Sequence, residues 1–283
     1  MTRKTVKHIK NGVSYFFLVI VTLVVMFPVF VMLSRSVMSN DEVSTLPVVI
    51  FPTKLSLEGF QAALAFENFW LYTGNTFILV VCNCILIPLS ASLCAFGFAK
   101  LKFVGKEFWF FLALCTTMLP TVVTQISLYV MYDRLNWLNT MLPLIVPGAF
   151  GGGAMNIFLI RQYMRGIPDS IQEAAKIDGA NWFRFFVKFM IPLCRPVIVL
   201  VVAQTFMAVW NDFMSPLIYL SSAPEKRTLG VGIYIKFLSD DGGRFPANLK
   251  MALGVLMVIP PVVLFSFFQK ELVEGVALSG MKL

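Results

Sequence analysis

The chain alternates between long uncharged apolar runs and shorter segments that carry all of its charged residues. Six of these runs approach or exceed the roughly 20 helical residues that cross the hydrocarbon core of a bilayer. They cover residues 11–34, 68–99, 108–132, 135–160, 196–211 and 251–269. Backbone groups find no water in lipid, so the pattern predicts an all-α membrane protein with about six transmembrane helices.

Composition supports this interpretation. The 283 residues are 58% hydrophobic and only 13% charged, with a mean hydropathy of +0.80, which excludes an ordinary soluble domain. No internal repeat or low-complexity segment divides the chain, so we expect a single transmembrane domain over residues 1–283. The five cysteines lie in or beside the apolar runs without the spacing of metal ligands. We expect them to be free, small apolar side chains.

The distribution of Lys and Arg predicts the orientation. If the N-terminus is cytoplasmic, six crossings place 15 of the 23 basic residues on the cytoplasmic side. The opposite orientation reverses this asymmetry, so the positive-inside rule predicts that both termini are cytoplasmic. The basic net charge therefore reflects membrane topology and does not indicate nucleic-acid binding. The first run is too long for a signal-peptide core, and no small-residue cleavage site follows it, so we expect a retained helix.

Proline and glycine interrupt several of these predicted helices. Pro88 lies within the second, where the lost hydrogen bond favours a packed interior position, and Pro120 lies near the middle of the third. The fourth, expected over residues 139–163, contains the glycine-rich run 148–154. Each glycine costs about 1 kcal/mol of helix stability against alanine. Close helix packing or a hinge would explain that cost, and close packing is the simpler interpretation.

A short amphipathic helix is predicted over residues 168–180, between the fourth and fifth crossings. Pro168 suits the first helical turn, and Ser170 with Glu173 fits a capping box. Gly179 suits a left-handed stop, which gives a helix of roughly 15 Å. The aromatic and basic run 182–189 that follows is typical of a helix at the membrane interface. Composition alone would allow residues 168–180 to be a solvated loop helix.

The same segment resembles the loop of ATP-binding-cassette (ABC) importer permeases, which is written E-A-A-x-x-x-G, followed by nine residues and then I-x-L-P. The motif positions are occupied by Glu173, Ala174, Ala175, Gly179 and Pro192. Phe189 stands where the motif has Ile and Ile191 where it has Leu, and the spacing is unchanged.

Two further segments are similar to the sugar-importer branch of that superfamily, and to the smaller six-helix permease of maltose-type systems. They are Trp210-Asn211-Asp212-Phe213 and the tail Ser279-Gly280-Met281-Lys282. The resemblance covers nearly the whole chain. It implies a multi-pass permease of the bacterial plasma (inner) membrane, with its core over about residues 70–270.

In that family the loop docks into a groove on an ATPase subunit and passes the closure of the ATPase pair to the transmembrane helices. The resemblance therefore implies a cytoplasmic coupling helix between helices four and five. Its docking positions would be Glu173, Ala174, Ala175 and Gly179, with Asp178 and Pro192 shaping the loop. Gly280 and Lys282 in the tail would approach the ATPase pair.

The resemblance also implies partners. They are a second permease subunit (a related but different chain, or a copy of this one), two ATPase subunits, and an extracytoplasmic solute-binding protein that delivers a sugar, most simply an oligosaccharide. The chain itself has no G-x-x-x-x-G-K-[ST] motif, because Gly105-Lys106 lacks the upstream glycine and Glu107 follows. We therefore expect ATP and Mg to bind the partner ATPase, and no cofactor or metal to bind this chain.

No catalytic residues are expected, because no triad or pair of carboxylates occurs and the only histidine, His8, lies in the basic N-terminal arm. Sugars are bound by hydrogen bonds and aromatic faces, which makes Trp210, Asn211 and Asp212 candidates for the substrate pathway. The competing interpretation places Trp210 at the membrane interface and Asp212 among the headgroups.

Three other functions remain as alternatives. A permease for a non-sugar solute would belong to the same superfamily. An ion-coupled secondary transporter needs ionisable groups within its spans, and Asp212 is the only candidate for that role. A membrane-embedded enzyme needs catalytic groups there, and the spans are free of charge. The sequence therefore favours the permease of an ABC importer of sugars.

Overall fold

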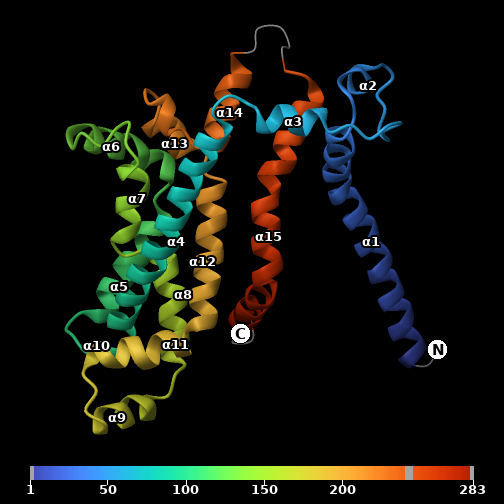
Figure 1. Ribbon diagram of the computed structural model, residues 1–283. Helices are drawn as coiled ribbons and strands as arrows, with labels where there is room; N and C mark the ends of the chain where they lie inside the picture. The colour runs from blue at the N-terminus through green and yellow to red at the C-terminus, as the bar shows by residue number, and fades with distance from the viewer. Residues whose placement is uncertain (1–2, 240–244, 281–283) are drawn as a thin grey trace. The chain divides into compact units, whose positions relative to one another are not determined.

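The computed structural model describes the backbone of residues 3–239 and 245–280, which form helices, turns and loops (Figure 1). The prediction of an all-helical chain is confirmed for this part of the protein. The α-helices are α1 (Arg3–Ser36), α2 (Asn40–Ser44), α3 (Glu58–Leu64), α4 (Phe69–Lys100), α5 (Lys106–Cys115), α6 (Thr121–Arg134), α7 (Leu142–Ala149), α8 (Ala154–Arg165), α9 (Asp169–Ile177), α10 (Trp182–Phe185), α11 (Ile191–Leu193), α12 (Arg195–Trp210), α13 (Met214–Tyr219), α14 (Leu229–Leu238) and α15 (Ala247–Gly280). Short 3₁₀ turns cover Thr116–Met118 and Pro224–Lys226, and a π-helical turn covers Phe186–Met190.

Backbone contacts divide the chain into two compact units. Unit 1 comprises Met1–Phe69 and Lys236–Pro260, and unit 2 comprises Trp70–Ile235 and Pro261–Leu283. Each unit has its own packing, and the candidate coupling helix belongs to unit 2.

In unit 1, the end of α1, α3 and the first turn of α15 pack closely together. A Cβ on Gly59 would lie 2.9 Å from the carbonyl oxygen of Asn248 and 3.0 Å from that of Ser36, so only glycine fits there. The Asn248 side chain donates a hydrogen bond to the Met38 carbonyl oxygen at 3.2 Å. Leu57 occupies the N-cap position of α3.

In unit 2, α4 runs the length of the unit beside α8 and α12 (Figure 1). It is one continuous helix that contains Pro88. Its last turns carry Ala91, Ala95 and Phe96, which pack in a common core with Ile160 of α8 and Val201 of α12. This core also includes Ala175 of α9, so it extends to the end of unit 2 where α9 lies.

Four helices of the described chain are long and apolar enough to cross a membrane: Asn11–Ser36, Phe69–Lys100, Leu142–Arg165 and Ala247–Gln269. Two bent pairs raise this number to six if each pair is one span: Lys106–Met118 with Val122–Arg134, bent by 100°, and Trp182–Leu193 with Arg195–Trp210, bent by 77°. The six predicted crossings correspond to these four segments together with the two bent pairs, if each bent pair is counted as one span. The first break falls at Pro120, where the chain is extended, so the third predicted helix is divided.

The glycine-rich run permits a close approach between α4 and the loop that joins α7 to α8. A Cβ on Gly152 would lie 2.3 Å from the carbonyl oxygen of Ile87, and one on Gly148 would lie 2.8 Å from its side chain. Gly152 also has a φ of +63°, a value that residues other than glycine rarely adopt. Ser90 donates a hydrogen bond to the Gly148 carbonyl oxygen at 3.0 Å. The prediction of close packing is confirmed.

Replacing Gly152 by alanine should destabilise unit 2, because the methyl group meets the backbone of α4. We expect the free energy of unfolding to fall by about 2 kcal/mol, measured by thermal unfolding in detergent. The matched control is Gly97→Ala in α4, where nothing lies within 4 Å of the added Cβ. Equal unfolding temperatures for the two variants would contradict the packing described here.

Candidate coupling site

Helix α9 (Asp169–Ile177) lies at one end of unit 2, close to α10 and to the C-terminal ends of α4 and α8 (Figure 1). Pro168 occupies the N-cap position with a ψ of 140°, and no side chain caps the helix. The predicted Ser170–Glu173 capping box is therefore wrong, because the helix begins at Asp169 and Ser170 already lies within its first turn. The Asp169 carboxylate is in that turn, where the helix dipole favours negative charge.

The end of α9 matches the prediction. Gly179 has a φ of +73°, the left-handed conformation that stops a helix at little cost in glycine. The amide of Ala180 donates to the Ala175 carbonyl oxygen at 2.9 Å, and the amide of Gly179 donates to that of Lys176 at 3.1 Å. These bonds satisfy carbonyl groups that the helix end would otherwise leave unpaired.

The predicted docking positions face two directions. Ala175 is 2% exposed and packs in the core of unit 2 together with Ile171 and Ala180. Glu173, Ala174, Asp178 and Gly179 are exposed. Ala175 thus holds α9 against its own protein, while the other positions form the outer face of the helix.

Ile177 is a feature of this face that sequence reasoning missed. Its side chain is 86% exposed, next to Asp178 and the helix stop. A large apolar residue among polar ones at the end of a short helix was the signal that could have identified it.

The aromatic run after α9 is packed onto α4. Phe96 of α4 lies with its ring centroid 5.1 Å from Phe186, 6.1 Å from Phe185 and 6.1 Å from Trp182. Phe185 and Phe186 are buried. Pro192 is exposed within α11, just before the 77° bend that leads into α12. The chain on the C-terminal side of α9 is therefore fixed to α4 by aromatic contacts.

On the N-terminal side, Lys100 joins the end of α4 to the start of α9. Its ammonium donates a hydrogen bond to the Ile167 carbonyl oxygen at 2.9 Å and pairs with the Asp169 carboxylate at 2.6 Å. The hydrogen bond and the charge of Lys100 lower the pKa of Asp169, and Lys102 adds a smaller effect. The stabilising contribution of this pair is complete above pH about 4 and is lost as the pH falls through the lowered pKa.

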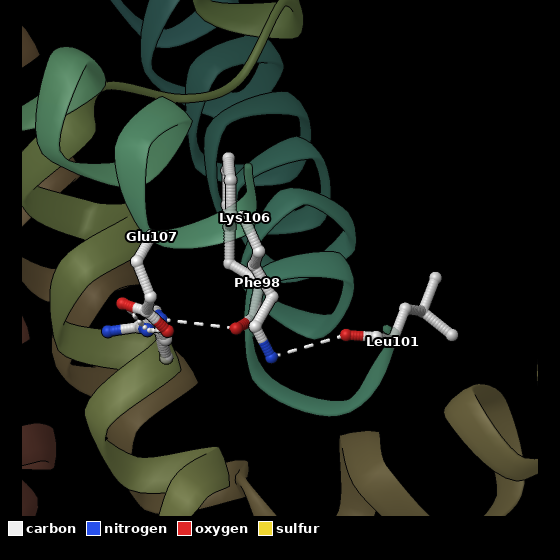
Figure 2. A network of polar contacts seen from close by, with 5 residues as sticks. Phe98, Leu101, Lys106 and Glu107 are labelled. Carbon is white, nitrogen blue, oxygen red and sulfur yellow. Dashed lines mark hydrogen bonds and ion pairs between the residues drawn. The ribbon is translucent and has the colours of Figure 1, made fainter. Parts of the chain in front are cut away.

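A second cation, Arg161 of α8, lies at the same end of α4. Its side chain is 3% exposed, and it donates to the Phe98 carbonyl oxygen at 3.2 Å. It also holds both carboxylate oxygens of Glu107, at 2.6 and 2.7 Å, and its guanidinium carbon lies 3.9 Å from the Phe110 ring centroid. Lys106 donates to the Leu101 carbonyl oxygen at 3.2 Å, as Figure 2 also shows. Arg161 therefore ties α8 to the end of α4 and the start of α5.

The candidate pathway residues lie around the C-terminal end of α12, away from α9 (Figure 1). Trp210 is 9% exposed and packs against Phe206 and Phe77 at centroid distances of 5.8 and 5.4 Å. The Asn211 side chain donates to the Met207 carbonyl oxygen, and the Asp212 carboxylate accepts from the Ser215 amide at 3.1 Å. The pathway role remains a prediction. Gly280 ends α15, and Lys282 lies outside the described residues.

The family described as the inner membrane component of binding-protein-dependent transport systems matches residues 88–277. The chain belongs to this family. It is therefore a multi-pass inner-membrane component of such a transport system, in agreement with its apolar helices.

Relatives of known name match this family member over nearly its full length. The arabinooligosaccharides transport system permease protein AraQ of Halalkalibacterium halodurans is 27% identical, covering 93% of each chain. The maltodextrin transport system permease protein MdxG of Bacillus subtilis is 26% identical, covering 100% of each. A crystal structure of a bacterial ABC transporter involved in the import of alginate contains a chain with the same fold, with a TM-score of 0.83, 22% identity, and coverage of 95% of this chain and 98% of that one.

Replacing Arg161 by methionine should loosen the permease at this end, because the Phe98 carbonyl loses its donor and Glu107 loses its partner. We expect a loss of about 2 kcal/mol in the free energy of unfolding, since Glu107 is itself 65% exposed and can be solvated. Arg165→Met is the control, because Arg165 is exposed on the same helix. If both variants unfold at the same temperature, Arg161 does not hold these helices together.

Proposed function

We propose that this chain is the transmembrane permease subunit of an ATP-binding-cassette importer that translocates a sugar, specifically an oligosaccharide. The observation that carries the proposal is the nearly full-length match to permeases named for arabinooligosaccharides and maltodextrin. Diacetylchitobiose uptake permeases of Streptomyces coelicolor match over 90% and 94% of the chain, which adds a third class of short sugar polymer.

The proposed energy source is an ATPase pair that docks on α9. The outer face of this helix offers Glu173, Ala174 and Gly179, with Asp178 and the exposed Ile177 beside them. Ala174 and Gly179 leave little side-chain bulk on this face, so another protein surface can approach the helix closely. Ala175 supports the role from the inside by holding α9 on the core, and Pro192 shapes the connection to α12.

This role places α9 and both termini in the cytoplasm, as the distribution of basic residues favours. The complete importer would contain a second, related permease chain, two ATPase subunits and an extracytoplasmic solute-binding protein. ATP and Mg would bind the ATPase subunits, and this chain would bind no cofactor and catalyse no reaction. The tail at Gly280 and Lys282 would approach the ATPase pair, and Trp210, Asn211 and Asp212 would line the pathway.

The mechanism follows from the position of α9. Closure of the ATPase pair on ATP would displace α9 on each permease, and the spans would change from an inward-facing to an outward-facing arrangement. The binding protein would then deliver its solute, and hydrolysis would restore the first state. In this scheme the permease supplies the pathway and the mechanical connection, while the energy comes from its partner.

Reversing charge or adding bulk on the outer face of α9 should uncouple the importer. Gly179→Asp forces a side chain into the left-handed conformation at φ +73°, and Glu173→Lys reverses an exposed charge. We expect both variants to reach the membrane but to lose ATPase co-purification and uptake of labelled oligosaccharides by about tenfold or more. An excess of unlabelled oligosaccharide should compete with the label, whereas amino acids should not.

The control is Glu225→Lys, an equal charge reversal at an exposed site of unit 2 that lies outside α9. This variant should keep ATPase binding and uptake. Normal uptake in both α9 variants would exclude the coupling role. Competition by amino acids in place of sugars would instead favour a non-sugar permease of the same superfamily.

A further inference from the structure

The contacts of Lys100 assign it a role that sequence comparison does not. We propose that Lys100 is a positioning residue that transmits the displacement of α9 to α4, a proposal that rests on the coupling function proposed for α9. Lys100 is the last residue of α4, and its ammonium lies between the Ile167 carbonyl oxygen and the Asp169 carboxylate.

The environment of this ammonium makes the connection strong. The Lys100 side chain is only 5% exposed, so both of its contacts are charge-assisted hydrogen bonds that compete little with water. It also lies at the C-terminal end of α4, where the helix dipole favours a positive charge. The two acceptors flank Pro168, whose ring fixes φ and stiffens the short chain between them. Lys100 therefore holds the start of α9 through two hydrogen bonds, one on each side of Pro168.

Through the covalent chain alone, a displacement of α9 would reach α8 and α12 before it reached α4. The residues that join α8 to α9 are 166–168, so a push on α9 passes through the backbone to α8 first. On its other side, α9 continues through α10 into α12. Helix α4 does not adjoin α9 in the sequence, so a displacement of α9 reaches it through side-chain contacts. Ala175 of α9 shares an apolar core with Ala95 and Phe96 of α4, and Lys100 adds hydrogen bonds that α4 makes directly with the start of α9. Apolar contacts can slide past one another, whereas the two hydrogen bonds of Lys100 fix the start of α9 at defined positions.

Helix α4 is the element whose movement would matter most in unit 2. It packs closely against Gly148 and Gly152, at the junction of α7 and α8, and it contributes Ala91 and Ala95 to the core. Closely packed helices move as rigid bodies. A displacement that reaches α4 would therefore reach α7, α8 and α12 together.

The exposure of Asp169 separates this role from a purely structural one. The Asp169 side chain is 80% exposed and is solvated when its partner is removed, so the loss of Lys100 leaves no buried charge without a partner. Loss of Lys100 should therefore weaken coupling much more than folding. Arg161, by contrast, contacts both carboxylate oxygens of Glu107 and the ring of Phe110, so its loss should mainly lower the free energy of unfolding.

The test uses the complete reconstituted transporter with Lys100→Met, which keeps an unbranched side chain one atom shorter and removes the ammonium group. We expect normal thermal stability and normal co-purification of the ATPase, with the solute imported per ATP hydrolysed reduced about tenfold. Lys100→Arg, which still donates to both acceptors, should recover most of this ratio. Lys102→Met is the control for loss of an exposed cation two residues beyond Lys100 and should match the unaltered protein.

A second variant, Asp169→Asn, keeps Lys100 in place and removes only the charge of its exposed partner. Its import per ATP should fall by a smaller factor, about threefold. An unchanged ratio in Lys100→Met and Asp169→Asn would overturn the proposal. The proposal would also be overturned if Lys100→Met lost thermal stability and ATPase co-purification along with the import per ATP. A third contradicting result is an import per ATP in Lys100→Arg as low as in Lys100→Met.

The two proposals fail in different ways. If Gly179→Asp and Glu173→Lys both retain ATPase binding and uptake, the coupling function of α9 fails, whatever the Lys100 variants do. If Gly179→Asp loses both while Lys100→Met keeps full coupling, α9 is the docking element and only the role of Lys100 is refuted.

Discussion

The connections of α4 to its neighbours at one end of unit 2 depend on two buried cations that meet its C-terminal end. The last carbonyl groups of a helix have no partner within it, and this end also carries partial negative charge. Arg161 of α8 donates a hydrogen bond to one of these carbonyl groups, that of Phe98. Lys100 belongs to α4 itself, and its side chain extends toward α9. A buried charge is tolerated only when it is paired and hydrogen-bonded. Both cations meet that condition, through Glu107 and Asp169.

These contacts explain how a helix of nine residues can be held firmly enough to act as a lever. A helix this short is marginal by itself in water. Ala175 anchors it to the core, Lys100 holds its first turn, and the aromatic cluster around Phe96 holds the chain that follows it. What remains exposed is one face with Glu173, Ala174 and Ile177. The same helix thus has an inner side fixed to its own protein and an outer side open to a partner.

The sequence predicted those features that depend on local pattern. Apolar run length located the spans, and Gly179 marked the end of α9 because only glycine adopts its conformation easily. Local pattern failed at the start of α9, where Pro168 takes the cap position that Ser170 was expected to fill. It also gave no warning that the span around Pro120 divides, since a proline within an apolar run is compatible with a kink or a break.

The contacts of Lys100 and Arg161 could not be predicted, because each joins positions far apart in the chain. Lys100 and Asp169 are 69 residues apart, and Arg161 and Glu107 are 54 apart. In the sequence these cations only contribute to the positive charge of the predicted cytoplasmic side. Their role becomes visible when the ends of α4 and α8 are brought together, and it is packing of the apolar residues that brings them there.

The most direct measurement is the distance between spin labels on Ser170 of α9 and Lys102 beyond the end of α4, in the assembled transporter without its five native cysteines. If α9 and α4 move as one body, binding of a nonhydrolysable ATP analogue should leave this distance unchanged within about 2 Å, while the distance from Ser170 to a label on the second permease changes. A larger change between Ser170 and Lys102 would show that α9 moves independently of α4 and would contradict the account.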